Sequence, residues 1–296
     1  MSKNKRTVSL VLGSGGARGL AHAGVIQWLE TNNFEIRSIS GSSMGALMGG
    51  IYACDKLDEY LDWLRALDEL DIVKLLDISV GEGGFVRGDK IIEALRGLVG
   101  DRQIEDLPVR FTAVAADIQA EKEIWIDHGP LFDAIRASIS LPLFFTPANH
   151  QGRQLLDGGI LNPVPIAPTF RDKNDLTIAV NLGGPHAEEG KLPTKTDHRP
   201  APNGLRDRVT SFLDELSDKA VKLGSTRADM LNIANQTFDT MQSALARQKL
   251  AAYPPDAVVT IARNACGTLE FDRVDEMIEL GMAVAERDLA HLKNSG

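Results

Sequence analysis

Residues 36–50 read IRSISGSSMGALMGG, and this stretch decides the fold. Its first part alternates apolar and polar residues, which is typical of a β-strand, and its last part carries small residues at helical spacing. Between the two parts, Gly-Ser-Ser-Met-Gly matches the Gly-x-Ser-x-Gly pattern of a sharp strand-to-helix turn. The sequence therefore predicts a strand, a turn and a helix, with the hydroxyl of Ser43 held clear of the backbone at the apex.

The two glycines of this turn, Gly41 and Gly45, leave no Cβ where the strand and the helix come closest. A helix N-terminus beneath Ser43 would also stabilise negative charge that develops there. A five-residue match of this kind is more often an ordinary turn than a catalytic one. The identity of Ser43 as a nucleophile therefore depends on the rest of the chain.

A glycine-rich turn precedes this stretch and has a similar setting. Residues 7–12 (TVSLVL) predict a strand, GSGGARG follows at 13–19, and apolar residues at helical spacing come next. A dinucleotide-binding turn would need glycine where Arg18 stands, and a phosphate-binding P-loop would end in Gly-Lys-Ser or Gly-Lys-Thr. The third interpretation is an oxyanion hole, in which backbone N–H groups at a helix N-terminus face an anionic intermediate. If the two strands are parallel, both turns lie at the same edge of the sheet.

A serine nucleophile needs a general base within hydrogen-bond reach. Asp157 is the strongest candidate, because it opens an Asp-Gly-Gly turn directly after a short strand predicted at residues 153–156. Such a turn is usually only structural, and a carboxyl group with its ordinary pKa near 3.9 would have to be partly desolvated to act as a base. The histidines occupy no convincing position for this role: His22, His128, His150, His186, His198 and His291.

The remaining elements alternate between strands and helices, as expected for an α/β protein. Residues 56–105 are mostly helical, but 76–88 is rich in glycine and is either a connecting loop or a mobile lid over an apolar pocket. Strands are predicted at 34–40, 110–117, 123–127, 174–182 and 257–262, and helices at 90–99, 130–139, about 205–223, 225–249 and near 271–293.

The 296 residues, of which 43% are hydrophobic, can form one large α/β domain or two small ones. Residues 183–204 shift to Gly, Pro, His and charge, which we interpret as a solvated insertion in one fold. The net charge of −9 argues against nucleic-acid binding, and no apolar run approaches the roughly 18 residues of a membrane helix. Only Cys54 and Cys266 are present, without metal-ligand spacing, so we expect a reducing cytoplasmic setting and a structural role for Cys54.

Three blocks together carry a family resemblance. GSGGARG at 13–19, GSSMG at 41–45 and DGG at 157–159, in this order, resemble the signature blocks of patatin-like phospholipases, particularly the bacterial cytoplasmic branch. The stretch IRASISLPLFFTP at 135–147 is similar to the segment that precedes the family's aspartate. The resemblance covers nearly the whole chain, most firmly residues 7–182. It implies a single three-layer α/β/α domain over residues 1–296, with a mostly parallel central sheet, helices on both faces and a helical part at 205–296.

The resemblance also implies the site. Ser43 is then the nucleophile and Asp157 the general base of a Ser-Asp dyad, while the N–H groups of Gly15 and Gly16, joined by Ala17, form the oxyanion hole. Arg18 matches the family's basic position and either touches the substrate or braces the glycine turn, and we favour bracing. The supporting motif positions are Gly13, Ser14, Arg18, Gly19, Gly41, Gly45, Gly158 and Gly159. One departure is that plant members open the first block with Asp-Gly-Gly-Gly, where this chain has Gly13 and Ser14.

The function that follows is a serine acyl hydrolase acting on carboxylic esters of lipids, like a phospholipase A or a lysophospholipase. It needs no metal or organic cofactor, and a lipid substrate requires at least transient membrane contact. One alternative is a non-lipolytic esterase or thioesterase of the same fold. Another is a low-turnover regulatory protein that retains the dyad, for which the region from 205 onward offers surface to a partner or a second subunit. A nucleotide-binding module fits least well.

Overall fold

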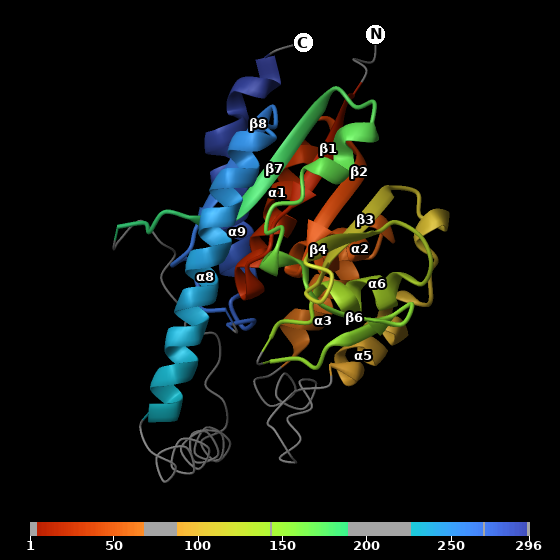
Figure 1. Cartoon of the computed structure of the whole chain (residues 1–296). Helices are drawn as coiled ribbons and strands as arrows, with labels where there is room; N and C mark the ends of the chain where they lie inside the picture. The colour runs from red at the N-terminus through yellow and green to blue at the C-terminus, as the bar shows by residue number, and fades with distance from the viewer. Residues whose placement is uncertain (1–4, 68–87, 143, 189–225, 269, 295–296) are drawn as a thin grey trace.

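The computed structural model describes residues 5–67, 88–142, 144–188, 226–268 and 270–294. Predictions that fall on other residues lie outside this part: the lid or loop at 76–87, residues 189–204 of the polar insertion, and the helix at about 205–223. Within the described residues, an eight-stranded sheet forms the middle layer, in the order β5-β6-β3-β2-β1-β7-β8 with β4 paired to β3 (Figure 1). Strands lie where the sequence predicts them, and the three-residue strand β5 is an addition. Their bounds are β1 Arg6–Leu12, β2 Phe34–Ser42, β3 Arg110–Asp117, β4 Lys122–Ile126, β5 Ala148–His150, β6 Arg153–Asp157, β7 Leu176–Gly184 and β8 Ala257–Ala262.

The central strands are parallel, as the two consecutive strand–turn–helix units require. β1 pairs with β2 and β7, β2 with β3, and β7 with β8, all in parallel register. The carboxyl ends of β1 and β2 therefore lie at one edge of the sheet. This edge receives both the glycine-rich turn and the turn that carries Ser43.

The strand that leads to Asp157 runs the other way. β6 pairs with β3 in antiparallel register, with Asp157 opposite Ala115. Val114, one residue before Ala115, pairs with Ser42 at the end of β2. The last residue of β6 therefore lies one strand away from the end of β2, close to Ser43.

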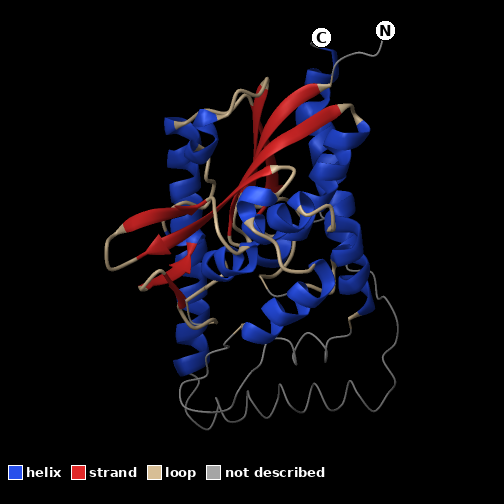
Figure 2. Cartoon of the chain, turned by 90° about the vertical axis from the view of Figure 1, so that its right-hand side faces the viewer, coloured by secondary structure: helices blue, strands red, loops and turns tan. Residues whose placement is uncertain are grey.

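Helices cover both faces of the sheet (Figure 2). One face carries α1, α2, α6 and α9, which pack on β1, β2, β3 and β8 through a large apolar core. Along β1, Val8, Leu10 and Leu12 are fully buried in this core. The helix bounds are α1 Ala21–Thr31, α2 Met44–Ala53, α3 Leu57–Ala66, α5 Asp89–Val99, α6 Leu131–Ser138, α8 Thr226–Ala252 and α9 Val274–Leu289. None of the helices in the described part combines the length and apolar composition that crossing a bilayer demands.

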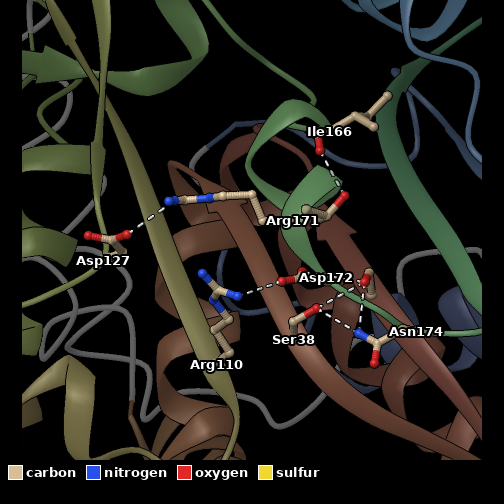
Figure 3. Close-up of polar contacts among 9 residues, drawn as sticks. Ser38, Arg110, Asp127, Ile166, Arg171, Asp172 and Asn174 are labelled. Carbon is tan, nitrogen blue, oxygen red and sulfur yellow. Dashed lines mark hydrogen bonds and ion pairs between the residues drawn. The ribbon is translucent and has the colours of Figure 1, made fainter.

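The opposite face is covered by α8 and by the segment that follows Asp157. Val11 of β1 packs there with Val164, Ile166, Ala179 and Ala246. Hydroxyl groups pin the rest of this segment to the sheet, since Ser40 Oγ donates to the Pro165 carbonyl at 2.7 Å. Further along, Asn174 Nδ2 donates to Ser38 Oγ and Ser9 Oγ, and Arg110 pairs with Asp172 (Figure 3). These contacts hold the segment that follows the Asp-Gly-Gly turn against the sheet.

The helices α1 and α9 make an unusually close contact. A Cβ at Gly24 of α1 would meet the Ile278 carbonyl of α9, and one at Gly281 would meet the Ala21 carbonyl of α1. The two backbones touch because neither glycine carries a side chain. Helix α1, near the start of the chain, is thus packed tightly against helix α9, near its end.

Candidate active site

Ser43 occupies a strained backbone position at the start of α2. Its φ of 56° and ψ of −124° lie in a region that residues with a side chain rarely adopt. A hydrogen bond holds it there, because the Ser43 N–H donates to Ser138 Oγ at 2.9 Å. Ser138 Oγ in turn donates to the Val114 carbonyl of β3 at 2.6 Å. The turn is therefore a sharp elbow of the predicted kind.

The glycines of the elbow are required by contact. A Cβ at Gly45 would collide with the Leu12 carbonyl at the end of β1, and one at Gly41 would collide with the Gly45 carbonyl. α2 thus starts directly against the backbone of the central strand. This close approach places Ser43 next to the glycine-rich turn that follows β1.

Ser43 and Asp157 lie in direct contact. Ser43 Oγ donates to Asp157 Oδ2 at 2.5 Å, and the Gly159 N–H donates to Asp157 Oδ1 at 2.7 Å. The Asp157 side chain is fully buried. Burial raises the pKa of Asp157 to about 7, although its hydrogen bonds with Ser43 and Gly159 pull the pKa down. Asp157 is therefore desolvated, which is the condition that a carboxylate must meet to act as a base near neutral pH.

The glycine-rich turn presents two backbone donors beside Ser43. Among the described residues, the N–H groups of Gly15 and Gly16 have no acceptor, and both glycines lie in a pocket that also contains Ser43. Gly16 has φ +58°, and a Cβ there would collide with the Thr268 backbone. The Ala17 N–H instead donates to the Thr268 carbonyl at 2.9 Å. Ala17 is therefore left out of the candidate oxyanion hole.

The buried side chain of Arg18 holds the glycine-rich turn by a hydrogen bond to its backbone. Arg18 is 4% exposed, and its Nε donates to the Gly15 carbonyl at 2.9 Å. Its two other guanidinium nitrogens bond the Arg263 carbonyl at 2.9 Å and Asp239 Oδ1 at 3.3 Å. The Gly15 C=O and the Gly16 N–H belong to one planar trans peptide and point in opposite directions. Because Arg18 holds the Gly15 carbonyl on its own side, the Gly16 N–H points away from Arg18.

Two pockets meet at Ser43. The larger, of about 860 Å³, is lined almost entirely by apolar side chains. The smaller, of about 410 Å³, contains Arg18, Asp239 and Gln242 as well as the glycine-rich turn. Gly16, Ser43, Leu141 and Thr268 line both. The lining of the larger pocket includes Met44, Leu47, Tyr60, Trp63, Leu64, Leu67, Ile91, Leu95, Ile139, Phe145 and Phe271.

His22 and Cys54 do not contribute a base or a nucleophile beside Ser43. His22 is fully buried on α1, and its Nε2 lies 2.9 Å from the Gly13 carbonyl, so it contacts the glycine-rich turn and not Ser43. Burial lowers the pKa of His22 to about 4. Burial raises the pKa of Cys54 to about 11, which keeps its thiol protonated at neutral pH. Among the described residues, no three His, Cys, Asp or Glu side chains gather as metal ligands would.

Sequence reasoning missed three side chains near Ser43. Ser138, which fixes the elbow, lies in the 135–147 block, but nothing in its spacing marks it as a partner of the Ser43 N–H. Asp239 and Gln242 come from α8, where a three-residue spacing puts both on one helix face. The sequence shows this spacing, but it does not show that this face of α8 is turned toward Ser43.

The family model and the similar sequences agree on the family of this chain. The family model described as patatin-like phospholipase matches residues 10–170. An uncharacterized NTE family protein of Mycobacterium tuberculosis is 39% identical, and the match covers 95% of this chain and 91% of that protein. Lysophospholipase nte1 of Emericella nidulans is 26% identical over 98% of this chain but only 18% of its own length. Among solved structures, VipD from Legionella pneumophila has a TM-score of 0.48 and 15% identity, covering 99% of this chain and 67% of that one. With the family model matching more than half of its length, the chain belongs to the patatin-like phospholipase family.

Proposed function

We propose that this protein is a serine acyl hydrolase that cleaves carboxylic esters of lipids with a Ser43–Asp157 dyad. The observation that carries the proposal is the 2.5 Å hydrogen bond from Ser43 Oγ to Asp157 Oδ2. A buried carboxylate whose pKa is raised to about 7 is matched to proton transfer at neutral pH. Asp157 can therefore take the hydroxyl proton while Ser43 Oγ attacks the ester carbonyl.

The glycine-rich turn supplies the electrostatic part of the reaction. Attack creates a tetrahedral intermediate with a negative oxygen, and the N–H groups of Gly15 and Gly16 are its donors. When the intermediate collapses, the proton on Asp157 passes to the departing alcohol oxygen. Water then attacks the acyl-Ser43 ester with Asp157 again as the base, which releases the carboxylic acid and restores the serine.

The larger pocket supports a lipid as the source of the acyl group. Its aliphatic and aromatic lining fits an acyl chain, because burying the chain there removes apolar surface from water. Relatives of this chain include a protein named as a lysophospholipase. A non-lipolytic esterase acting on small esters would not fill so extensive an apolar lining.

Two neighbouring serines provide a matched test of the nucleophile. Ser42 is fully buried, whereas Ser43 is only partly buried, and the Ser42 Oγ has no hydrogen-bond partner among the described residues. We expect Ser43→Ala to abolish labelling by a fluorophosphonate probe and hydrolysis of long-chain p-nitrophenyl esters. Ser42→Ala should retain both, because it removes only an unsatisfied hydroxyl. Full activity of the Ser43→Ala variant would refute the proposal.

The same assay separates lipid esters from other esters. A lipid hydrolase should show a kcat/KM that rises with acyl-chain length as more of the apolar pocket is filled, by roughly 0.8 kcal/mol of binding per buried CH₂ at most. A kcat/KM that is highest for acetyl and butyryl esters would favour the esterase alternative.

A further inference from the structure

The smaller pocket differs from the larger one in chemistry as well as in size. It meets the larger pocket at Ser43 and, unlike it, is lined in part by α8, which contributes Phe238, Asp239 and Gln242. An ester bound with its carbonyl at Ser43 has two halves, and the apolar pocket accommodates the acyl half. The alcohol half is then directed toward the smaller pocket.

The charged groups of this pocket are not equally available. Arg18 has a side chain only 5% exposed, and all three of its guanidinium nitrogens bond protein oxygens. Asp239 has a side chain 41% exposed, and among the described residues Arg18 is its only partner, at 3.3 Å. The cation is therefore occupied and buried, while the carboxylate faces the space where the alcohol half would lie.

The amide next to Asp239 is held as well. Gln242 is 9% exposed, and its Nε2 donates to Ser14 Oγ at 3.2 Å. This contact ties α8 to the glycine-rich turn. The acidic and amide side chains are thus fixed relative to Ser43, which is the condition for selecting between substrates.

Resting on the proposed function, we infer that Asp239 selects the alcohol half of the substrate. The pocket favours alcohols that offer hydrogen-bond donors, either free hydroxyls or an ammonium group, and disfavours those with a net negative charge. A carboxylate accepts hydrogen bonds strongly from such donors. It also repels an anionic phosphate brought close to it.

Three esters with the same octanoyl chain test this selection, used below the concentrations at which they aggregate. They are monooctanoylglycerol with neutral hydroxyls, octanoyl lysophosphatidylethanolamine with a primary ammonium group and no net charge, and the anionic octanoyl lysophosphatidylglycerol. Rates are normalised to the fraction of protein labelled by a fluorophosphonate. We expect wild-type kcat/KM to be lowest for the anionic ester, and the order of the other two shows whether the pocket prefers an alcohol half with a primary ammonium group or one with hydroxyls alone.

Two substitutions should move this preference in opposite directions. Asp239→Asn removes the carboxylate and leaves the charge of Arg18 without its partner, so kcat/KM for the anionic ester should rise roughly tenfold relative to the preferred ester. Gln242→Glu adds a second carboxylate and should lower the same ratio by a similar factor. Because the two variants are independent, a folding defect in one leaves the other as the test.

The matched control is Asp127→Asn. Asp127 is a carboxylate with a side chain 35% exposed that pairs with Arg171 at 3.5 Å (Figure 3), and it lines neither pocket. Its loss should leave the ratio between the three esters unchanged. If wild type hydrolyses the esters but neither Asp239→Asn nor Gln242→Glu changes the ratio, the inference is wrong while the proposed function stands. If wild type hydrolyses none of them and Ser43 is not labelled, both are wrong.

Discussion

Ser43 and Asp157 are each held at a local cost in stability. The left-handed φ of Ser43 costs roughly 1–3 kcal/mol for a residue with a side chain. Asp157 is fully buried with two hydrogen bonds, and no cation of the described part of the chain pairs with it, so its charged form is disfavoured. Both costs are concentrated at the two atoms where proton transfer would begin.

The raised pKa of Asp157 predicts the pH dependence of the nucleophile. Below pH 7 the carboxyl group is protonated and cannot accept the Ser43 proton, so the rate of fluorophosphonate labelling should fall about tenfold per pH unit. The measurement is the labelling rate between pH 5 and 9, with circular dichroism to show that the protein stays folded. A labelling rate that stays constant down to pH 5 would contradict the role given to desolvation.

The same residue should make stability depend on pH. The ordinary pKa of 3.8 applies in the unfolded chain and about 7 in the folded one. Between these values the folded state keeps a proton that the unfolded state has released, so the free energy of unfolding falls as pH rises, by roughly 1.4 kcal/mol per unit. Asp157→Asn removes this penalty, and its gain in melting temperature over wild type should be larger at pH 8 than at pH 5.

A control substitution isolates this effect. Asp175 is exposed, and hydrogen bonds from the Thr7 N–H and hydroxyl, with Arg6 and Arg37 nearby, lower its pKa, so it stays ionised over this pH range. Asp175→Asn should therefore change the melting temperature equally at pH 5 and pH 8. A constant difference for Asp157→Asn as well would show that Asp157 is not desolvated.

At the scale of elements, the site depends on how closely α2 approaches β1. The strands β1, β2 and β6 and the helix α2 were all predictable, because their alternation, glycine turns and helical spacing are local. The antiparallel direction of β6 was not, since it depends on pairing with β3 across the sheet. Ser138 was missed for the same reason, because its partners Ser43 and Val114 come from other elements.

Gly45→Ala tests the approach of α2 to β1. In a free helix alanine is better than glycine by roughly 1 kcal/mol, but here the new Cβ collides with the Leu12 carbonyl. We expect a loss of about 3 kcal/mol or more in the free energy of unfolding, measured by urea denaturation, together with loss of labelling at Ser43.

Gly97 offers the control for this substitution. It lies in α5, and a Cβ there would have no atom within 4 Å. Gly97→Ala should stabilise the protein by roughly 0.5–1 kcal/mol, as helix propensity alone predicts. Equal gains from both substitutions would mean that α2 does not touch β1.

At the scale of the whole molecule, Arg18 connects parts that lie far apart in the chain. Its bonds join the glycine-rich turn to Arg263 after β8 and to Asp239 of α8. The sequence placed Arg18 in a family block and favoured a role in bracing the glycine-rich turn over contact with the substrate. It did not indicate the partners Arg263 and Asp239, which lie more than 200 residues away in the chain. Long-range partners of this kind are invisible to local patterns, which is also why the role of α8 was not foreseen.

Arg18→Lys distinguishes bracing from substrate contact. Lysine keeps the charge but cannot reach three acceptors with one planar group, so the peptide of Gly15 and Gly16 loses its fixed orientation. We expect kcat to fall roughly 10- to 100-fold with little change in KM, because the lost orientation matters in the transition state. A raised KM with an unchanged kcat would instead place Arg18 on the substrate.

The contact between α1 and α9 has a consequence for synthesis of the protein. α1 is made early, but its close partner Gly281 emerges from the ribosome only after nearly all the other described elements. Until then, the surface of α1 that receives α9 has nothing to cover it, and exposed apolar surface of this kind promotes aggregation of nascent chains. A chain cut before Val274 would keep both Ser43 and Asp157 and still precipitate when translated in a cell-free system, whereas the full chain would stay in solution.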